Sequence, residues 1–131
     1  RRMMIFASED IGMADPHALP LAVSAHQAFE AVGLPEGWIP LSHAATYLAA
    51  APKSNASYKA YKNALAAIRE TGSLPVPLHL RNAPTKLMKE LGYGQEYRYP
   101  HDEPDFAKDQ SYLPEKLLGK KFYLPKKPVR D

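Results

Sequence analysis

Proline is the residue that most limits what this chain can fold into. The 131 residues include 13 prolines, five in residues 1–74 and eight in residues 75–131. Proline interrupts helices because it lacks a backbone N–H and its ring clashes with the preceding turn. Alanine, present 19 times, is the strongest helix former. The two residues together predict short helices bounded by prolines, followed by a more irregular segment.

Apolar residues in the first 74 positions recur at helical spacing. The pattern predicts helices over residues 1–9, 15–32, 41–51 and 55–71. Asp15-Pro16 and Ser54 are expected to begin helices, since Asp and Ser are good N-caps and proline is tolerated in the first turn. Residues 34–40 are expected to form a loop, with Trp38 packed onto the core as an anchor.

The second half of the chain is richer in proline than the first. It predicts a short helix over residues 84–91 and a helical turn near residues 114–118. We therefore expect one all-α domain, a compact bundle of about four to five short helices. Residues 1–74 would form the helical block, and residues 75–131 a long irregular Pro-rich segment wrapped around it.

Composition excludes several kinds of site. The chain has no cysteine, which rules out disulfides, thiolate metal sites and a cysteine nucleophile. The phosphate-binding pattern G-x-x-x-x-G-K-[ST], the pattern G-x-G-x-x-G and the hydrolase elbow G-x-S-x-G are all absent from the sequence. No apolar run reaches the roughly 18 residues of a membrane span. The missing initiator methionine indicates a piece of a longer protein.

Three groups of polar residues are candidates for a metal-binding or catalytic site. His26 and Glu30 lie four residues apart and could share a metal ion, but a third ligand at helical spacing is missing, which favours a surface polar pair. Residues 101–105 combine one histidine with three carboxylates, where a solvated acidic turn is the simpler interpretation. Glu9 and Asp10 diverge on a helix, which favours capping or an ion pair with an arginine.

The end of the chain is basic. Residues 116–130 hold six cations and no acid, namely Lys116, Lys120, Lys121, Lys126, Lys127 and Arg130. These side chains are candidates for contact with nucleic-acid phosphates, and Phe122 and Tyr123 could stack on bases. The alternative is a solvated tail that the two aromatic residues pin to the core. The formal net charge of +3 is too small to decide between them.

Several strings, in this order and spacing, resemble one family over nearly the whole chain. They are Arg2-Met3-Met4, Phe6-Ala7-Ser8-Glu9-Asp10-Ile11-Gly12, Ala14-Asp15-Pro16, Ala51-Pro52-Lys53-Ser54-Asn55-Ala56, Pro77-Leu78-His79-Leu80-Arg81-Asn82-Ala83 and Tyr97-Arg98-Tyr99-Pro100-His101. The chain resembles the C-terminal domain of the replication-associated recombination protein A family, also called MgsA, whose eukaryotic relative is Werner helicase-interacting protein.

The resemblance implies a function as well as a fold. Members of the family are AAA+ ATPases related to clamp loaders that act on DNA at stalled replication forks and in recombination. It implies a collar-like helical domain that assembles a homotetramer and has no catalytic role or cofactor of its own. ATP and Mg²⁺ would bind an ATPase core outside this chain. DNA and single-strand-binding protein would be partners of the full-length, cytoplasmic, nucleoid-associated protein.

The strings nominate a set of structural or interface residues. These family-motif residues are Ser8, Glu9, Asp10, Gly12, Asp15, Pro16, Pro52, Lys53, Ser54, Asn55, His79, Arg81, Tyr99, Pro100 and His101. Most are expected to serve the internal fold, with Glu9 or Asp10 pairing with Arg2 or Arg81. The alanine-rich faces of residues 18–32 and 41–51 are expected to offer surface for a second copy.

Overall fold

The computed structural model is all-helical, which confirms the predicted fold class. It describes residues 1–97, 99 and 110–128. Its α-helices are α1 (Arg2–Phe6), α2 (Ala18–Val32), α3 (Trp38–Ala50), α4 (Ala56–Thr71) and α5 (Lys86–Glu90). A π-helical turn, η1 (Ala7–Ile11), and the 3₁₀ turns η2 (Gly12–Ala14), η3 (Leu78–Leu80) and η5 (Glu115–Leu117) accompany them. In the described part of the chain, no helix is both long and apolar enough to span a membrane.

Local signals set the helix boundaries much as expected. Oδ1 of Asp15 accepts the backbone N–H of His17 at 3.0 Å, and α2 begins at Ala18. Ser54 Oγ accepts the N–H of Ala56, the first residue of α4, at 3.4 Å. Gly33 follows the last residue of α2 with a positive φ of 71°, a conformation that suits glycine and ends the helix.

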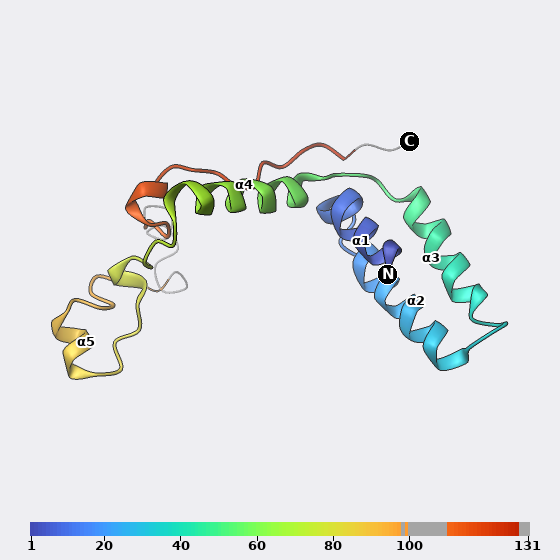
Figure 1. Cartoon of the computed structure of the whole chain (residues 1–131), viewed down its shortest axis with the longest axis horizontal. Coiled ribbons are helices and arrows are strands. Elements are labelled where there is room, and N and C mark those ends of the chain that lie inside the picture. The colour runs from blue at the N-terminus through green and yellow to red at the C-terminus, as the bar shows by residue number, and fades with distance from the viewer. Residues whose placement is uncertain (98, 100–109, 129–131) are drawn as a thin grey trace. The chain divides into compact units, whose positions relative to one another are not determined.

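The chain divides into two compact units. Unit 1 comprises residues 1–66 and 121–131, and unit 2 comprises residues 67–120. In unit 1, α2 and α3 form an antiparallel hairpin, and α1 with η1 packs against it (Figure 1). The core of unit 1 lies where these elements meet, around Ile11, Ala18 and Leu48.

The core is built almost entirely from small side chains. Eight of the ten buried apolar residues in the described part of the chain are alanines, and the other two are Ile11 and Leu48. On the hairpin, Ala18, Ala22, Ala25, Ala44 and Leu48 are all buried. A methyl side chain lets two helix backbones approach closely but buries little apolar area. The buried alanines of these faces are thus used inside unit 1, which corrects the expectation that they would be offered to a second copy.

Two segments far apart in sequence join at the start of α4. The N–H of Ser54 donates to the carbonyl of Asp10 at 2.7 Å. Gly12, which follows η1, has a φ of +50°, and a Cβ built there would lie 3.2 Å from the Ser54 carbonyl oxygen. Glycine is therefore required at position 12 for both its conformation and its close approach.

The segment after residue 120 runs beside α4 (Figure 1). Within unit 1, the Asn63 side-chain amide donates to the Phe122 carbonyl at 3.3 Å. The apolar stripe expected on α4 is present but incompletely covered, since Tyr61 is 59% exposed and Tyr58 is half-buried.

Trp38 corrects one expectation. It is the first residue of α3 and 63% exposed, so it is not an anchor in the core of this chain. Pro40 does not keep residues 38–40 in a loop, because proline is compatible with the first turn of a helix, where the N–H groups have no partner within the helix.

Unit 2 is held by backbone contacts of polar side chains. Thr85 Oγ1 accepts the N–H of Met88 at 3.2 Å and caps α5. A ring nitrogen of His79 lies 2.7 Å from the carbonyl oxygen of Ser111. Arg81 Nε donates to the Val76 carbonyl at 2.6 Å, and its guanidinium lies 4.9 Å from the centre of the Tyr93 ring.

Candidate functional site

Apolar side chains gather at the turn between α2 and α3. Val32, Leu34, Trp38 and Ile39 are 56%, 62%, 63% and 70% exposed, and we call them the turn patch. All four lie within residues 32–39, from the last residue of α2 to the second residue of α3. Exposed apolar residues scattered singly are common, but a contiguous group that includes a tryptophan is typical of a surface covered by a partner.

The turn that carries this patch is well defined. The N–H of Gly37 donates to the Gly33 carbonyl at 2.6 Å. A Cβ on Gly37 would lie 2.7 Å from Cδ2 of Phe29, so the turn packs directly on that ring. The patch is therefore displayed by a fixed backbone, which lowers the entropy cost of placing it in an interface.

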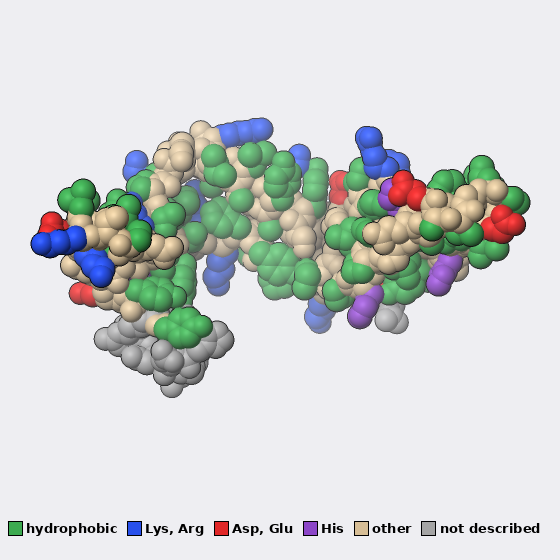
Figure 2. Space-filling view, turned by 90° about the horizontal axis from the view of Figure 1, so that it is seen from below, with side chains coloured by type: hydrophobic (Ala, Val, Ile, Leu, Met, Phe, Trp, Pro, Cys, Tyr) green, Lys and Arg blue, Asp and Glu red, His purple; other side chains and the backbone are tan. Residues whose placement is uncertain are grey.

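A second apolar feature of unit 1 is a groove of about 570 Å³ beside the start of α4. It is lined by Met4, Ile5, Ser8, Glu9, Leu19, Ser57, Tyr58 and Tyr61. Figure 2 shows apolar side chains reaching the surface on the face in view. Ser8 and Glu9, two family-motif residues, thus border apolar surface. Among the described residues, neither Glu9 nor Asp10 forms the expected ion pair with Arg2 or Arg81.

A polar pocket of about 320 Å³ lies near the junction of η1 with α4. Its lining residues are Phe6, Asp10, Lys53, Ser54, Asn55, Lys126 and Lys127, and we call it the lysine pocket. Lys53 is fixed at the end of α3, where its ammonium donates to the carbonyls of Ala49, at 3.0 Å, and Ala51. The same ammonium lies 5.8 Å from the centre of the Phe6 ring.

Like charges meet at the edge of this pocket. A hydrogen-bond contact with the Lys59 side chain, followed by repulsion between the two charges, lowers the pKa of the Lys126 ammonium. No carboxylate of the described residues lies within 4.0 Å of the ammonium groups of Lys53, Lys59, Lys126 or Lys127. The pocket therefore concentrates positive charge that the described part of the chain does not neutralise.

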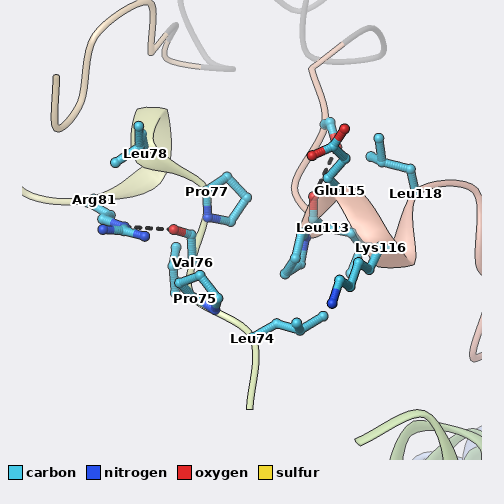
Figure 3. Close-up of a pocket in the computed structure, with 12 residues that line it drawn as sticks. Leu74, Pro75, Val76, Pro77, Leu78, Arg81, Leu113, Glu115, Lys116 and Leu118 are labelled. Carbon is cyan, nitrogen blue, oxygen red and sulfur yellow. Dashed lines mark hydrogen bonds between the residues drawn. The ribbon is translucent and has the colours of Figure 1, made fainter. Parts of the chain in front are cut away.

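Unit 2 has a pocket of about 450 Å³ with mostly apolar walls (Figure 3). Leu74, Pro75, Val76, Pro77 and Leu78 form one side, and Leu113, Glu115, Lys116 and Leu118 form the other. Arg81 lies at its edge, bonded to the Val76 carbonyl. Pro75 and Pro77, from the Pro-rich second half of the chain, thus form part of the wall of this pocket.

The basic residues predicted to contact DNA are divided between the two units. Lys116 lines the pocket of unit 2, and Lys120 pairs with Glu70 at 3.5 Å in that unit. Lys121 is exposed, whereas Lys126 and Lys127 line the lysine pocket of unit 1. Arg130 lies outside the described residues.

Only some of the candidate metal and acid–base residues lie in the described part of the chain. His26 and Glu30 lie 3.6 Å apart on the outer face of α2, as expected for a surface polar pair. Within residues 1–97, 99 and 110–128, no three His, Cys, Asp or Glu side chains are placed to share a metal ion. Pro100 and the cluster of residues 101–105, His101 included, lie outside this part of the chain.

Sequence reasoning missed two contacts. The phenol of Tyr47 donates to Oδ2 of Asp15 at 2.6 Å, and this bond lowers the pKa of the Asp15 carboxyl and raises that of Tyr47. The sequence also carries no signal for the meeting of Lys53 with Lys126 and Lys127, since they are far apart in the chain.

The order of the motif strings along this helical chain agrees with the C-terminal region of an AAA+ ATPase. The profile of the family described as "MgsA AAA+ ATPase C terminal" matches residues 1–130, and the chain belongs to this family.

Curated relatives agree with that assignment. The chain is 56% identical to "Replication-associated recombination protein A" of Coxiella burnetii over 126 residues, covering 95% of this chain and 29% of that protein. It is 52% identical to the Escherichia coli K12 protein of the same name, again covering 95% of this chain and 28% of the relative. It is 48% identical to "ATPase WRNIP1" of Dictyostelium discoideum, covering 94% and 14%. The chain thus spans less than a third of these relatives.

Proposed function

We propose that this chain is the non-catalytic homotetramerisation domain of a replication-associated AAA+ ATPase. The turn patch is the observation that carries the proposal. Val32, Leu34, Trp38 and Ile39 leave most of their surface in water while the core of the same chain is built from alanine. A chain that keeps its large apolar side chains outside and its small ones inside gains much of its burial only on assembly.

Symmetry suits such a surface to a closed oligomer. A twofold interface uses the same patch on both copies, and a tetramer can be built from two such interfaces. Aromatic residues are enriched at the centres of interfaces. Trp38 stands at the first position of α3, on a turn fixed by Gly33, Gly37 and Phe29. The turn patch therefore has both the composition and the rigidity that support this role.

The names of the relatives support a wider activity for the whole protein. The names "Replication-associated recombination protein A" and "ATPase WRNIP1" support a role in replication-associated recombination for the whole protein. In this proposal a part of the protein outside this chain binds ATP and Mg²⁺, and the assembled protein acts on DNA and with single-strand-binding protein in the cytoplasm, at the nucleoid. The present domain holds the ATPase parts together.

The test is the mass of the 131-residue chain in solution. Light scattering at micromolar concentration should give the mass of four copies. The double substitution Trp38→Lys with Ile39→Lys should shift it to that of a smaller species, because charged side chains at the centre of an interface cannot be paired. His26→Lys is the matched control, since it adds a charge on the exposed face of α2 away from the turn.

Circular dichroism separates loss of assembly from loss of fold. The exposed positions Trp38 and Ile39 should tolerate lysine within the chain, so helix content should be unchanged. A monomer for the unsubstituted chain would overturn the proposal. A tetramer that survives the double substitution would remove the turn patch from the interface.

A further inference from the structure

The proposed assembly does not explain the lysine pocket. Among the described residues that line it, Lys53, Lys126 and Lys127 are cationic, and Asp10 is the one acid. A fourth lysine, Lys59, stands against Lys126 at its edge. Solvated lysines normally spread apart on a surface, so their concentration around one concave site marks a place where negative charge is stabilised.

One of these cations is held in place by the fold. The Lys53 ammonium donates to the Ala49 and Ala51 carbonyls and lies over the Phe6 ring. Its position is therefore set by the end of α3, with no carboxylate among the described residues to neutralise it. A cation fixed before a ligand arrives loses little conformational entropy on binding.

Hydrogen-bond donors accompany the charge. Asn55 lines the pocket at the residue before α4, and its side-chain amide makes no hydrogen bond to the described residues. The start of this 16-residue helix adds partial positive charge from its first backbone N–H groups. Oxygen atoms of an anion entering the pocket would thus meet both ammonium groups and neutral donors.

We propose that the lysine pocket binds a phosphate group. Phosphate presents several strong acceptor oxygens to converging ammonium donors, and lysine is a common partner for it as a point charge. The group could belong to the backbone of a nucleic acid or to a small phosphate compound, and the chemistry at the pocket is the same. A volume of about 320 Å³ leaves room for the group and accompanying water.

The repulsion at the pocket edge agrees with this assignment. Contact with Lys59 lowers the pKa of the Lys126 ammonium, so the unliganded site disfavours its own charge. An anion between the two lysines would reverse that effect, since a nearby opposite charge favours the ionised form. Phosphate binding should consequently raise the pKa of Lys126.

The test uses the whole 131-residue chain and two probes. Backbone amide NMR would follow titration with inorganic phosphate and, separately, with an oligothymidylate single strand at low salt. We expect shifts at residues 53–55 with both probes, or with one of them. Shifts with phosphate alone identify a small phosphate as the source, and shifts with the oligonucleotide alone identify a nucleic-acid backbone.

Substitution tests which side chains are responsible. Lys126→Gln with Lys127→Gln should weaken binding of whichever probe acts by about tenfold, because two of the pocket charges are lost. For the oligonucleotide it should also lower the slope of log K against log salt by about 0.7 for each phosphate contact removed. Lys86→Gln with Lys89→Gln is the control, with the same loss of charge on α5 in unit 2.

A third variant strengthens the site. Asp10→Asn removes the one acid that lines the pocket while leaving the backbone carbonyl that accepts from Ser54. It should tighten binding about threefold or more, an effect that damage to the fold would not produce. No shift with either probe, or equal losses in the Lys86 and Lys89 control, would overturn the proposal. The solution mass is measured independently, so failure here leaves the assembly proposal standing.

Discussion

The Tyr47 hydroxyl donates a 2.6 Å hydrogen bond to Oδ2 of Asp15. Tyr47 belongs to α3, and Asp15 precedes α2 and accepts the N–H of His17 through its other carboxylate oxygen. One carboxylate therefore both initiates a helix and ties it to the helix packed against it. The Asp15-Pro16 string is explained by this contact inside the chain.

Removing the phenol should weaken unit 1. Tyr47→Phe deletes the hydrogen bond to a charged acceptor, and we expect the free energy of unfolding to fall by about 1.5 kcal/mol. Urea denaturation followed by circular dichroism measures the change. Tyr61→Phe is the control, because Tyr61 is 59% exposed and makes no hydrogen bond to the described residues. An equal decrease in the free energy of unfolding of both variants would show that the hydrogen bond to Asp15 does not stabilise the chain.

The same bond should appear in the pH dependence of stability. The pKa of Asp15 is lowered from 3.8, chiefly by the Tyr47 bond, so its contribution is present above 3.8 and is lost as pH falls through the lower folded value. The pKa of Tyr47 is raised from 10.0, so its contribution is full below 10.0 and is lost as pH rises through the higher folded value. The stability difference between the wild-type chain and Tyr47→Phe should be constant from about pH 5 to about pH 9 and shrink on both sides. A difference that is independent of pH down to pH 2 would contradict this.

Enlarging a core alanine should be costly. Ala22 is 4% exposed in the contact of α2 with α3, and Ala22→Leu adds three carbon atoms where the helices meet. Overpacking of this kind costs about 1–3 kcal/mol. Thermal unfolding should show the loss, whereas Ala45→Leu, on the exposed face of α3, should be close to neutral. An unfolding temperature for Ala22→Leu that is equal to or above that of Ala45→Leu would contradict close packing of α2 against α3 at Ala22.

Gly12 should resist substitution more than another glycine with a positive φ. Gly12→Ala combines a positive φ with a Cβ placed 3.2 Å from the Ser54 carbonyl. Gly72 has a φ of +71° but nothing within 4 Å of a built Cβ, so Gly72→Ala isolates the conformational cost of about 1–2 kcal/mol. In chemical denaturation, Gly12→Ala should have a lower free energy of unfolding than Gly72→Ala. The opposite order would exclude a tight junction between η1 and the start of α4.

Helix boundaries in this chain could be predicted because their causes are local. Gly33 and Gly72 end helices by adopting positive φ values, and Asp15 and Ser54 begin them by accepting nearby N–H groups. The exposure of Trp38 could not be predicted, because burial depends on how α2 and α3 pair and not on hydrophobicity alone. The sequence does not distinguish a tryptophan buried in the core from a tryptophan that contacts another copy of the chain.

Contacts between distant residues were equally beyond local reasoning. Glu9 or Asp10 was expected to form an ion pair, yet the backbone carbonyl of Asp10 accepts from Ser54, and Asp10 lines the lysine pocket. Arg81 was a candidate partner for it, but its guanidinium is engaged by Val76 and Tyr93 in unit 2. The contacts of these residues depend on which backbone segments meet, and local sequence does not reveal that.

The alanine core of the α2–α3 hairpin sets a limit on how related sequences can diverge. Where two helices approach over Ala18, Ala22 and Ala44, a side chain that extends past Cβ has no space, and only glycine or serine comes close to alanine in size. We therefore expect amino-acid exchange to be restricted at these positions, with adaptation to new surroundings occurring on the outer faces of the same helices. The outer faces of the hairpin can thus vary while the packing between α2 and α3 stays the same.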